Sequence, residues 1–190
     1  MQPRDLDRTL RRLEPGGWLA AARRFGSSLR TAGHEPGRLL VVGTPEEEPW
    51  HLTAHLDQAA RFGGMESLLS TLVRWHVPAG APAHLAVDIS AVNQAARGAT
   101  VFVATPGVAD EHLLERLDDA RRGGATLFAL HPGEEQLDSL VHESLSLPTV
   151  GGMDVAEGWE TATHVVSAVS ASEPRRRRSL WRPRSTSTSG

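Results

Sequence analysis

The stretch from Ala99 to Leu130 constrains the fold more than any other part of the chain. Its first apolar run, residues 101–104, ends at Thr105-Pro106-Gly107, and an amphipathic helix with leucines at helical spacing follows. That helix ends at Gly123-Gly124, and a second apolar run spans residues 125–130. Continuous apolar runs bounded by Gly and Pro are typical of strands buried on both faces. The stretch therefore predicts a right-handed βαβ unit with parallel strands.

The same patterns predict further elements on both sides of this unit. We expect strands over residues 38–42, 84–89 and 144–147, and helices over 4–14, 18–31, 49–62, 90–96, 134–142 and 154–171, with a second apolar segment over 66–75 continuing the helical region. Together they indicate a three-layer α/β/α domain with a five-stranded parallel, flavodoxin-like sheet. We expect N-terminal helices in residues 1–36, the α/β domain in 37–172 and a disordered tail in 173–190. The N-terminal pair would cover either the sheet or a dimer partner.

Composition excludes several kinds of chemistry. The 190 residues contain no Cys and no Tyr, and every basic side chain except His is Arg. Thiolate nucleophiles, disulfides, Schiff-base lysines and P-loop lysines are therefore excluded. No apolar run is long enough to cross a bilayer and no secretory segment is evident, so we expect a cytoplasmic protein.

The element order carries a family resemblance. RRGGATLFAL (residues 121–130), a short helix and ESLSLP (residues 143–148) follow the central strand, and the first strand ends in Gly43-Thr44. This arrangement resembles the sugar isomerase (SIS) domain family. The resemblance implies a five-stranded parallel sheet, a homodimer, and binding of phosphosugars at the carboxyl ends of the strands.

The family's phosphate loop reads Ser-x-Ser-Gly-x-Thr-x-Glu, and here the matching residues 104–111 keep only the Gly and the Glu. The three hydroxyl positions hold Ala104, Pro106 and Ala109, and Pro106 also lacks a backbone N–H. Each hydrogen bond lost to a charged ligand is worth roughly 1.5–3 kcal/mol. The loop therefore predicts much weaker phosphate binding than in the family.

The resemblance still implies candidate site residues. A ligand would meet the free N–H groups and hydroxyls at the strand ends, contributed by Gly43, Thr44, Thr105 and Gly107, with His131 at the end of the last long strand. Glu111 is the candidate catalytic base, because an isomerase needs a carboxylate or a histidine beside the sugar carbonyl. The competing interpretation is that Glu111 complements the helix dipole and that His131 belongs to a turn.

Two other groups of residues allow more than one interpretation. His51 and His55 have the spacing of a helical metal pair, but HLTAH lacks the glutamate of HExxH, so we assign no metal site and expect no cofactor. Six of the 20 basic residues lie in residues 175–190, where no acidic residue occurs. Such a tail either contacts nucleic acid or an anionic membrane, or only solubilises the chain.

The sequence leaves three functional hypotheses. The first is a non-catalytic SIS-like module that binds a small anionic or carbohydrate-derived ligand, or a protein partner, and acts in regulation. The second is a phosphosugar aldose–ketose isomerase that uses Glu111. The third is a regulator that reaches nucleic acid or a membrane through its tail.

Overall fold

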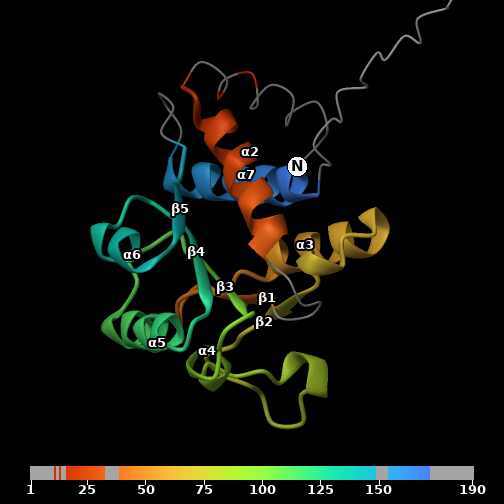
Figure 1. The fold of residues 1–190 in the computed structure, drawn as a ribbon, viewed down its shortest axis with the longest axis vertical. Coiled ribbons are helices and arrows are strands. Elements are labelled where there is room, and N and C mark those ends of the chain that lie inside the picture. Colours follow the sequence, from red (N-terminus) through yellow and green to blue (C-terminus); the bar gives the residue numbers. More distant parts are fainter. Residues whose placement is uncertain (1–10, 12, 14–15, 33–38, 149–153, 172–190) are drawn as a thin grey trace, which may run out of the picture.

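The chain forms one parallel sheet between two layers of helices (Figure 1). The computed structural model describes residues 11, 13, 16–32, 39–148 and 154–171. The strands are β1 (Leu39–Val42), β2 (Ser70–Leu72), β3 (Thr100–Ala104), β4 (Thr126–His131) and β5 (Glu143–Ser146). The α-helices are α2 (Trp18–Ala32), α3 (Trp50–Gly63), α4 (Ser90–Asn93), α5 (Glu111–Arg122), α6 (Glu135–Leu140) and α7 (Val155–Ser170), and the short 3-10 helices are η1 (Glu66–Leu68) and η2 (Ala83–Leu85).

All five strands pair in parallel, in the order β2-β1-β3-β4-β5. The order reverses direction between β1 and β3, so the first half of the sheet grows one way and the second half the other. The carboxyl ends of β1 and β3 therefore flank the switch point where α/β sheets receive their ligands. The predicted fold class and the central βαβ unit are both confirmed.

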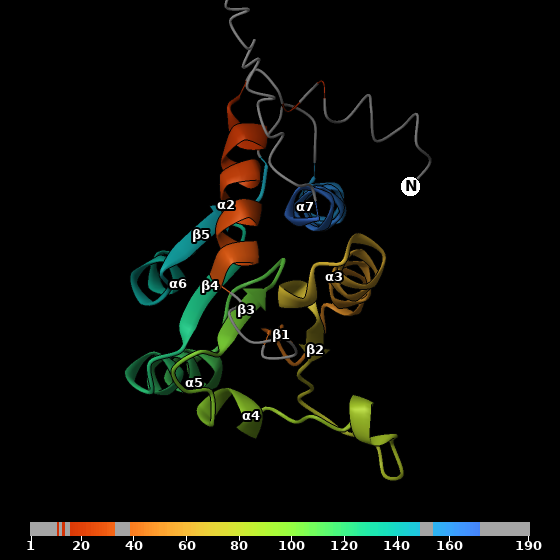
Figure 2. The same ribbon diagram turned by 45° about the vertical axis from the view of Figure 1, so that its right-hand side comes forward.

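Side chains alternate across the sheet because successive strand residues point to opposite faces. On β3, Phe102 and Ala104 enter the core beneath α2, α3 and α7, whereas Val101 and Val103 enter the core beneath α4, α5 and α6. Figures 1 and 2 show the two helical layers on opposite faces of the sheet. Both cores are fully buried, as expected for a parallel sheet.

Helix α2 lies directly on the sheet. The Phe25 ring packs 5.5 Å from the Phe102 ring and 5.4 Å, edge to face, from the Phe128 ring. A side chain at Gly26 would come within 2.8 Å of Val169 and 2.9 Å of Ser170, so this glycine lets α2 and α7 cross closely. Within the described ranges, no helix is both long and apolar enough to span a membrane.

Two predicted elements are wrong. Residues 66–75 form η1 and the edge strand β2, because residues 70–72 hydrogen-bond to β1. Residues 84–89 do not form a strand: they contain η2, and only Asp88 makes a single bridge, to Arg74. The fifth strand of the sheet is therefore β2. The predicted helix over 4–14, the boundary at residue 36 and the tail from 173 lie outside the described residues.

Candidate functional site

The loop between β1 and α3 is the most tightly packed part of the carboxyl edge. A side chain on Gly43 would overlap the Glu47 carbonyl oxygen and lie 2.7 Å from Pro49 Cδ. Thr44 is buried, and its hydroxyl oxygen accepts a hydrogen bond from the Glu47 N–H at 3.3 Å. The loop therefore folds back on Gly43, and the Thr44 hydroxyl is bound within the loop itself.

Contacts from the segment after β2 hold the far end of this loop. The Glu48 carboxylate accepts hydrogen bonds from Arg74 Nε at 3.2 Å and from the Trp75 backbone N–H at 3.3 Å. The Arg74 guanidinium lies 4.7 Å from the centroid of the Trp50 ring, a cation–π arrangement. The Trp75 indole N–H donates to the Gly43 carbonyl at 2.9 Å. These contacts fix the position of Trp50 at the start of α3.

The loop between β3 and α5 uses its own side chains to bind its N–H groups. The hydroxyl oxygen of Thr105, which is fully buried, accepts from the Gly107 N–H at 3.0 Å. Asp110 caps α5 by accepting from the Leu113 N–H at 2.7 Å. The Ala109 N–H donates to Glu134 Oε2 at 2.9 Å. A carboxylate of the chain therefore already occupies part of the position where a phosphate would bind in such a loop.

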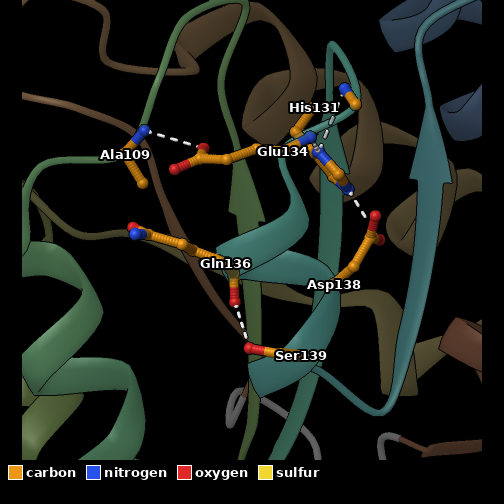
Figure 3. A network of polar contacts seen from close by, with 7 residues as sticks. Ala109, His131, Glu134, Gln136, Asp138 and Ser139 are labelled. Carbon is orange, nitrogen blue, oxygen red and sulfur yellow. Dashed lines mark hydrogen bonds and ion pairs between the residues drawn. The ribbon is translucent and has the colours of Figure 1, made fainter.

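His131 organises the turn that brings Glu134 to this loop (Figure 3). Its side chain is completely buried, and Nδ1 accepts from the N–H groups of Gly133 at 3.2 Å and Glu134 at 2.7 Å. Because Nδ1 is an acceptor, the proton lies on Nε2, which donates to Asp138 Oδ1 at 3.2 Å. Both ring nitrogens are thus bound within the chain, which is how a turn histidine behaves.

The other oxygen of Glu134, Oε1, is buried and has no hydrogen-bond partner among the described residues. A buried carboxylate oxygen without a partner loses its hydration without compensation. This cost is offset in part by the bond from Glu134 Oε2 to Ala109. The contact joins residues 25 positions apart, and the sequence alone carries no signal for it.

Glu111 lies in the first turn of α5 with its side chain exposed. It borders a recess of about 520 Å³ between α5 and α6, together with Ala109, Leu114, Gln136, Ser139 and Leu140. No residue of the β1–α3 loop lines this recess. Glu111 is therefore separated from the side chains that Thr44 and its neighbours bring to the edge.

A second cleft, of about 530 Å³, opens between the β1–α3 loop, the start of α3 and helix α7. Its lining combines three carboxylates, two tryptophans, two histidines and small or apolar residues: Glu47, Glu48, Pro49, Trp50, His51, Leu52, Ala156, Trp159, Glu160, Thr163 and His164. The predicted site residues Gly43 and Thr44 lie just below this lining, in the loop that supports it. Thr105, Gly107 and His131 do not line it.

Three histidines lie close to this cleft. The His55 ring on α3 packs 4.9 Å from the His164 ring on α7, and His164 Nδ1 is 2.8 Å from the Glu160 carbonyl oxygen. Burial, with the nearby His164 and His51, lowers the pKa of His55. Across the described part of the chain, no group of three or more histidines and carboxylates is placed to hold a metal ion.

Sequence reasoning missed Trp159, Glu160, Thr163 and Glu134. The first three lie on α7, whose approach to α3 is a tertiary contact between segments about 100 residues apart. An available signal was the cluster of polar residues on the otherwise apolar final helix. Trp50, which the sequence placed beside Thr44, does line the cleft.

No protein-family model matches the sequence, and no curated protein is significantly similar to it. Among solved structures, the chain is similar to the Vibrio vulnificus NanR protein complexed with ManNAc-6P, with a TM-score of 0.51 and 12% identity over 78% of this chain and 52% of that one. The RpiR transcription factor from Sphaerobacter thermophilus (sugar isomerase domain) aligns with a TM-score of 0.50 and 15% identity over 87% of this chain and 83% of that one. The chain has the fold of the sugar isomerase domain.

A third structure of the same fold, E. coli CFT073 c3406 in complex with a phosphosugar, aligns with a TM-score of 0.50 and 12% identity over 90% of this chain and 92% of that one. The chain spans about half the length of the NanR protein. The resemblance indicated by the sequence is thus confirmed as a likeness of fold. The two loops at the carboxyl edge, which bind their own backbone, set this sugar isomerase fold apart from the family's phosphate-binding pattern.

Proposed function

We propose that this chain is a non-catalytic sugar isomerase-type domain that binds a small carbohydrate-derived ligand and acts in regulation. The single observation that carries the proposal is the pair of contacts in the β3–α5 loop. Gly107 donates to Thr105 and Ala109 donates to Glu134, so the loop that would hold a substrate phosphate is filled by the chain itself. The cleft between α3 and α7 remains open as the place for a ligand.

The position of Glu111 supports a binding role over an isomerase. Moving a proton next to a carbonyl requires a base within hydrogen-bond reach of the substrate. Glu111 is exposed and borders the recess beside α6, whereas the aromatic cleft lies beside α7. A sugar in the cleft would therefore lack this base. Incubating the chain with aldose phosphates in heavy water tests the alternative: exchange at C2 that Glu111→Gln abolishes would establish an isomerase.

The solved relatives add weight to a regulatory role. One of them is described as a transcription factor, and two were solved with bound phosphosugars, ManNAc-6P in the NanR protein. The homodimer, the cytoplasmic location, the division into three segments and the contact of the arginine-rich tail with nucleic acid or membranes stay part of this proposal. Light scattering and binding assays with and without residues 174–190 test the dimer and the tail.

A thermal-shift screen against sugars, sugar phosphates and nucleotides tests the proposal. A ligand present at 100 times its Kd stabilises the folded chain by about 2.7 kcal/mol. In a chain of this size that raises Tm by about 5–11 °C. The same ligand should have a smaller effect on Trp50→Ala, with Phe62→Ala on the same helix as the control, because Phe62 is 87% exposed and lines no part of the cleft. If no compound raises Tm at millimolar concentration, ligand binding is refuted and only a scaffold for a protein partner remains.

A further inference from the structure

The charge of the α3–α7 cleft is unlike that of a phosphate site. Three carboxylates line it, and its described lining contains no arginine, while lysine is absent from the sequence. Glu48 is bound by Arg74 and by the Trp75 N–H. The carboxylates of Glu47 and Glu160 have no hydrogen bond or ion pair within the described residues, and both side chains are exposed to the cleft and solvent. The cleft therefore holds an excess of negative charge.

The uncharged part of the lining suits a sugar ring. Trp50 is 40% exposed and Trp159 is partly exposed, so both offer indole surface to a ligand. The apolar C–H face of a pyranose packs on such rings, and its hydroxyls require a few well-placed polar groups. Carboxylates accept hydrogen bonds from hydroxyls, and Thr163 and the imidazoles both donate and accept. The lining supplies each of these groups.

A phosphate would meet repulsion here and find no compensation. A phosphate dianion in the cleft would lie close to Glu47 and Glu160 without an arginine on the described lining to neutralise it. The N–H groups of Gly107 and Ala109, which the fold offers elsewhere at this edge, are bound by Thr105 and Glu134. A protonated amine, in contrast, is attracted by the same two carboxylates.

We infer that the cleft binds an unphosphorylated sugar, and an amino sugar in preference to a neutral one. This inference rests on the proposed function, since it names the class of ligand for the same domain. Glu160 and Glu47 receive the amine, Trp50 and Trp159 pack against the ring, and His51 and Thr163 bind hydroxyls. The domain thus differs from a phosphosugar-binding protein in the charge of its ligand.

Titrating the full chain with D-glucosamine, D-glucose and the 6-phosphate of each, followed by tryptophan fluorescence and calorimetry, tests the inference. D-glucosamine should bind at least about tenfold more tightly than its 6-phosphate, a difference of about 1.4 kcal/mol. Its advantage over D-glucose should shrink as salt is added, because exposed charges are screened. Equal or tighter binding of the 6-phosphates overturns the inference but leaves the proposed function standing. If none of the four sugars nor any compound of the wider screen binds, the proposed function itself fails.

Two matched pairs of variants locate the effect. Glu160→Gln should weaken D-glucosamine binding several-fold and narrow the preference over the 6-phosphate, while Glu157→Gln, on the same helix but outside the lining, should change neither. Trp50→Ala should weaken all four sugars, and Phe62→Ala none. All four side chains are largely solvent-exposed, so each variant should fold. If Glu160→Gln and Glu157→Gln behave alike, the cleft does not hold the amine and the inference is wrong.

Discussion

Replacing Gly43 by alanine should open the loop that supports the cleft. The new methyl group would overlap the Glu47 carbonyl oxygen and lie 2.7 Å from Pro49 Cδ and 3.2 Å from the Ala104 carbonyl oxygen. Two of these three neighbours are backbone atoms, which cannot rotate away as a side chain can. The loop must therefore move as a unit, and Glu47, Glu48 and Trp50 must move with it.

The control is the same substitution at Gly107, in the neighbouring loop of the same sheet edge. There the nearest atom to a new methyl group is the Thr105 hydroxyl oxygen at 3.9 Å, and φ is not positive. Gly107→Ala should change the free energy of unfolding by less than about 1 kcal/mol, and the change should be towards higher stability because the unfolded chain loses freedom.

Overpacking of this kind costs typically 1–3 kcal/mol. With two backbone contacts, we expect Gly43→Ala to lower the free energy of unfolding by about 3 kcal/mol, which lowers Tm by about 6–12 °C in a chain of this size. Urea unfolding followed by tryptophan fluorescence, together with calorimetry, measures both variants. A Gly43→Ala protein within about 0.5 kcal/mol of the wild type would refute the close packing of this loop, and so would equal losses in the two variants.

Three further outcomes follow from contacts in the structure. Glu134→Ala leaves the buried Ala109 N–H without an acceptor and should cost about 1–3 kcal/mol in urea unfolding, whereas Glu134→Gln, which keeps an acceptor, should cost less; equal losses would contradict this role. Asp138→Ala leaves the Nε2–H of His131 unbound and should also destabilise, and Asp138→Asn should not; the Tm values of the two variants decide. His55 has a lowered pKa in the folded chain, so its neutral ring stabilises the fold above its unfolded pKa of 6.5, and this contribution is lost as pH falls below that value. The fall in Tm on acidification should therefore be smaller in His55→Gln than in His112→Gln, whose histidine is exposed on α5; identical pH profiles would contradict this.

The central part of the fold was predictable from the sequence because its signals are local. The runs that become β3 and β4 are continuous and apolar, and Gly123-Gly124 marks the end of the helix between them. These residues are buried on both faces of the sheet, so burial and sequence pattern agree. Long buried elements of this kind leave little room for another assignment.

The edge strand was not predictable in the same way. Leucines in residues 68–72 have helical spacing, and only the three residues of β2 pair, through hydrogen bonds to β1. Those bonds come from a strand about 30 residues away, and a short edge strand has one partner only. In contrast, residues 84–89 alternate like a strand, but no strand of the sheet lies beside them beyond the bridge at Asp88.

The site was predictable only in part, for the same physical reason. The sequence indicated the strand-end loops and the loss of hydroxyls in residues 104–111, because both are local features. The carboxylate of Glu134 that fills the β3–α5 loop depends on the turn built by His131, and the cleft depends on α7 lying against α3. Neither contact has a local signature.

The measurement that tests the account most directly is a two-dimensional amide NMR titration of the labelled full chain with D-glucosamine and, separately, with its 6-phosphate. The account predicts that D-glucosamine shifts the signals of residues 47–52 and 159–164 and the indole signals of Trp50 and Trp159, while the 6-phosphate shifts them weakly. Residues 105–111 should keep their positions with both sugars. Strong shifts at Gly107, Ala109 and Glu111 on addition of the 6-phosphate, with the α3–α7 cleft unchanged, would contradict the account.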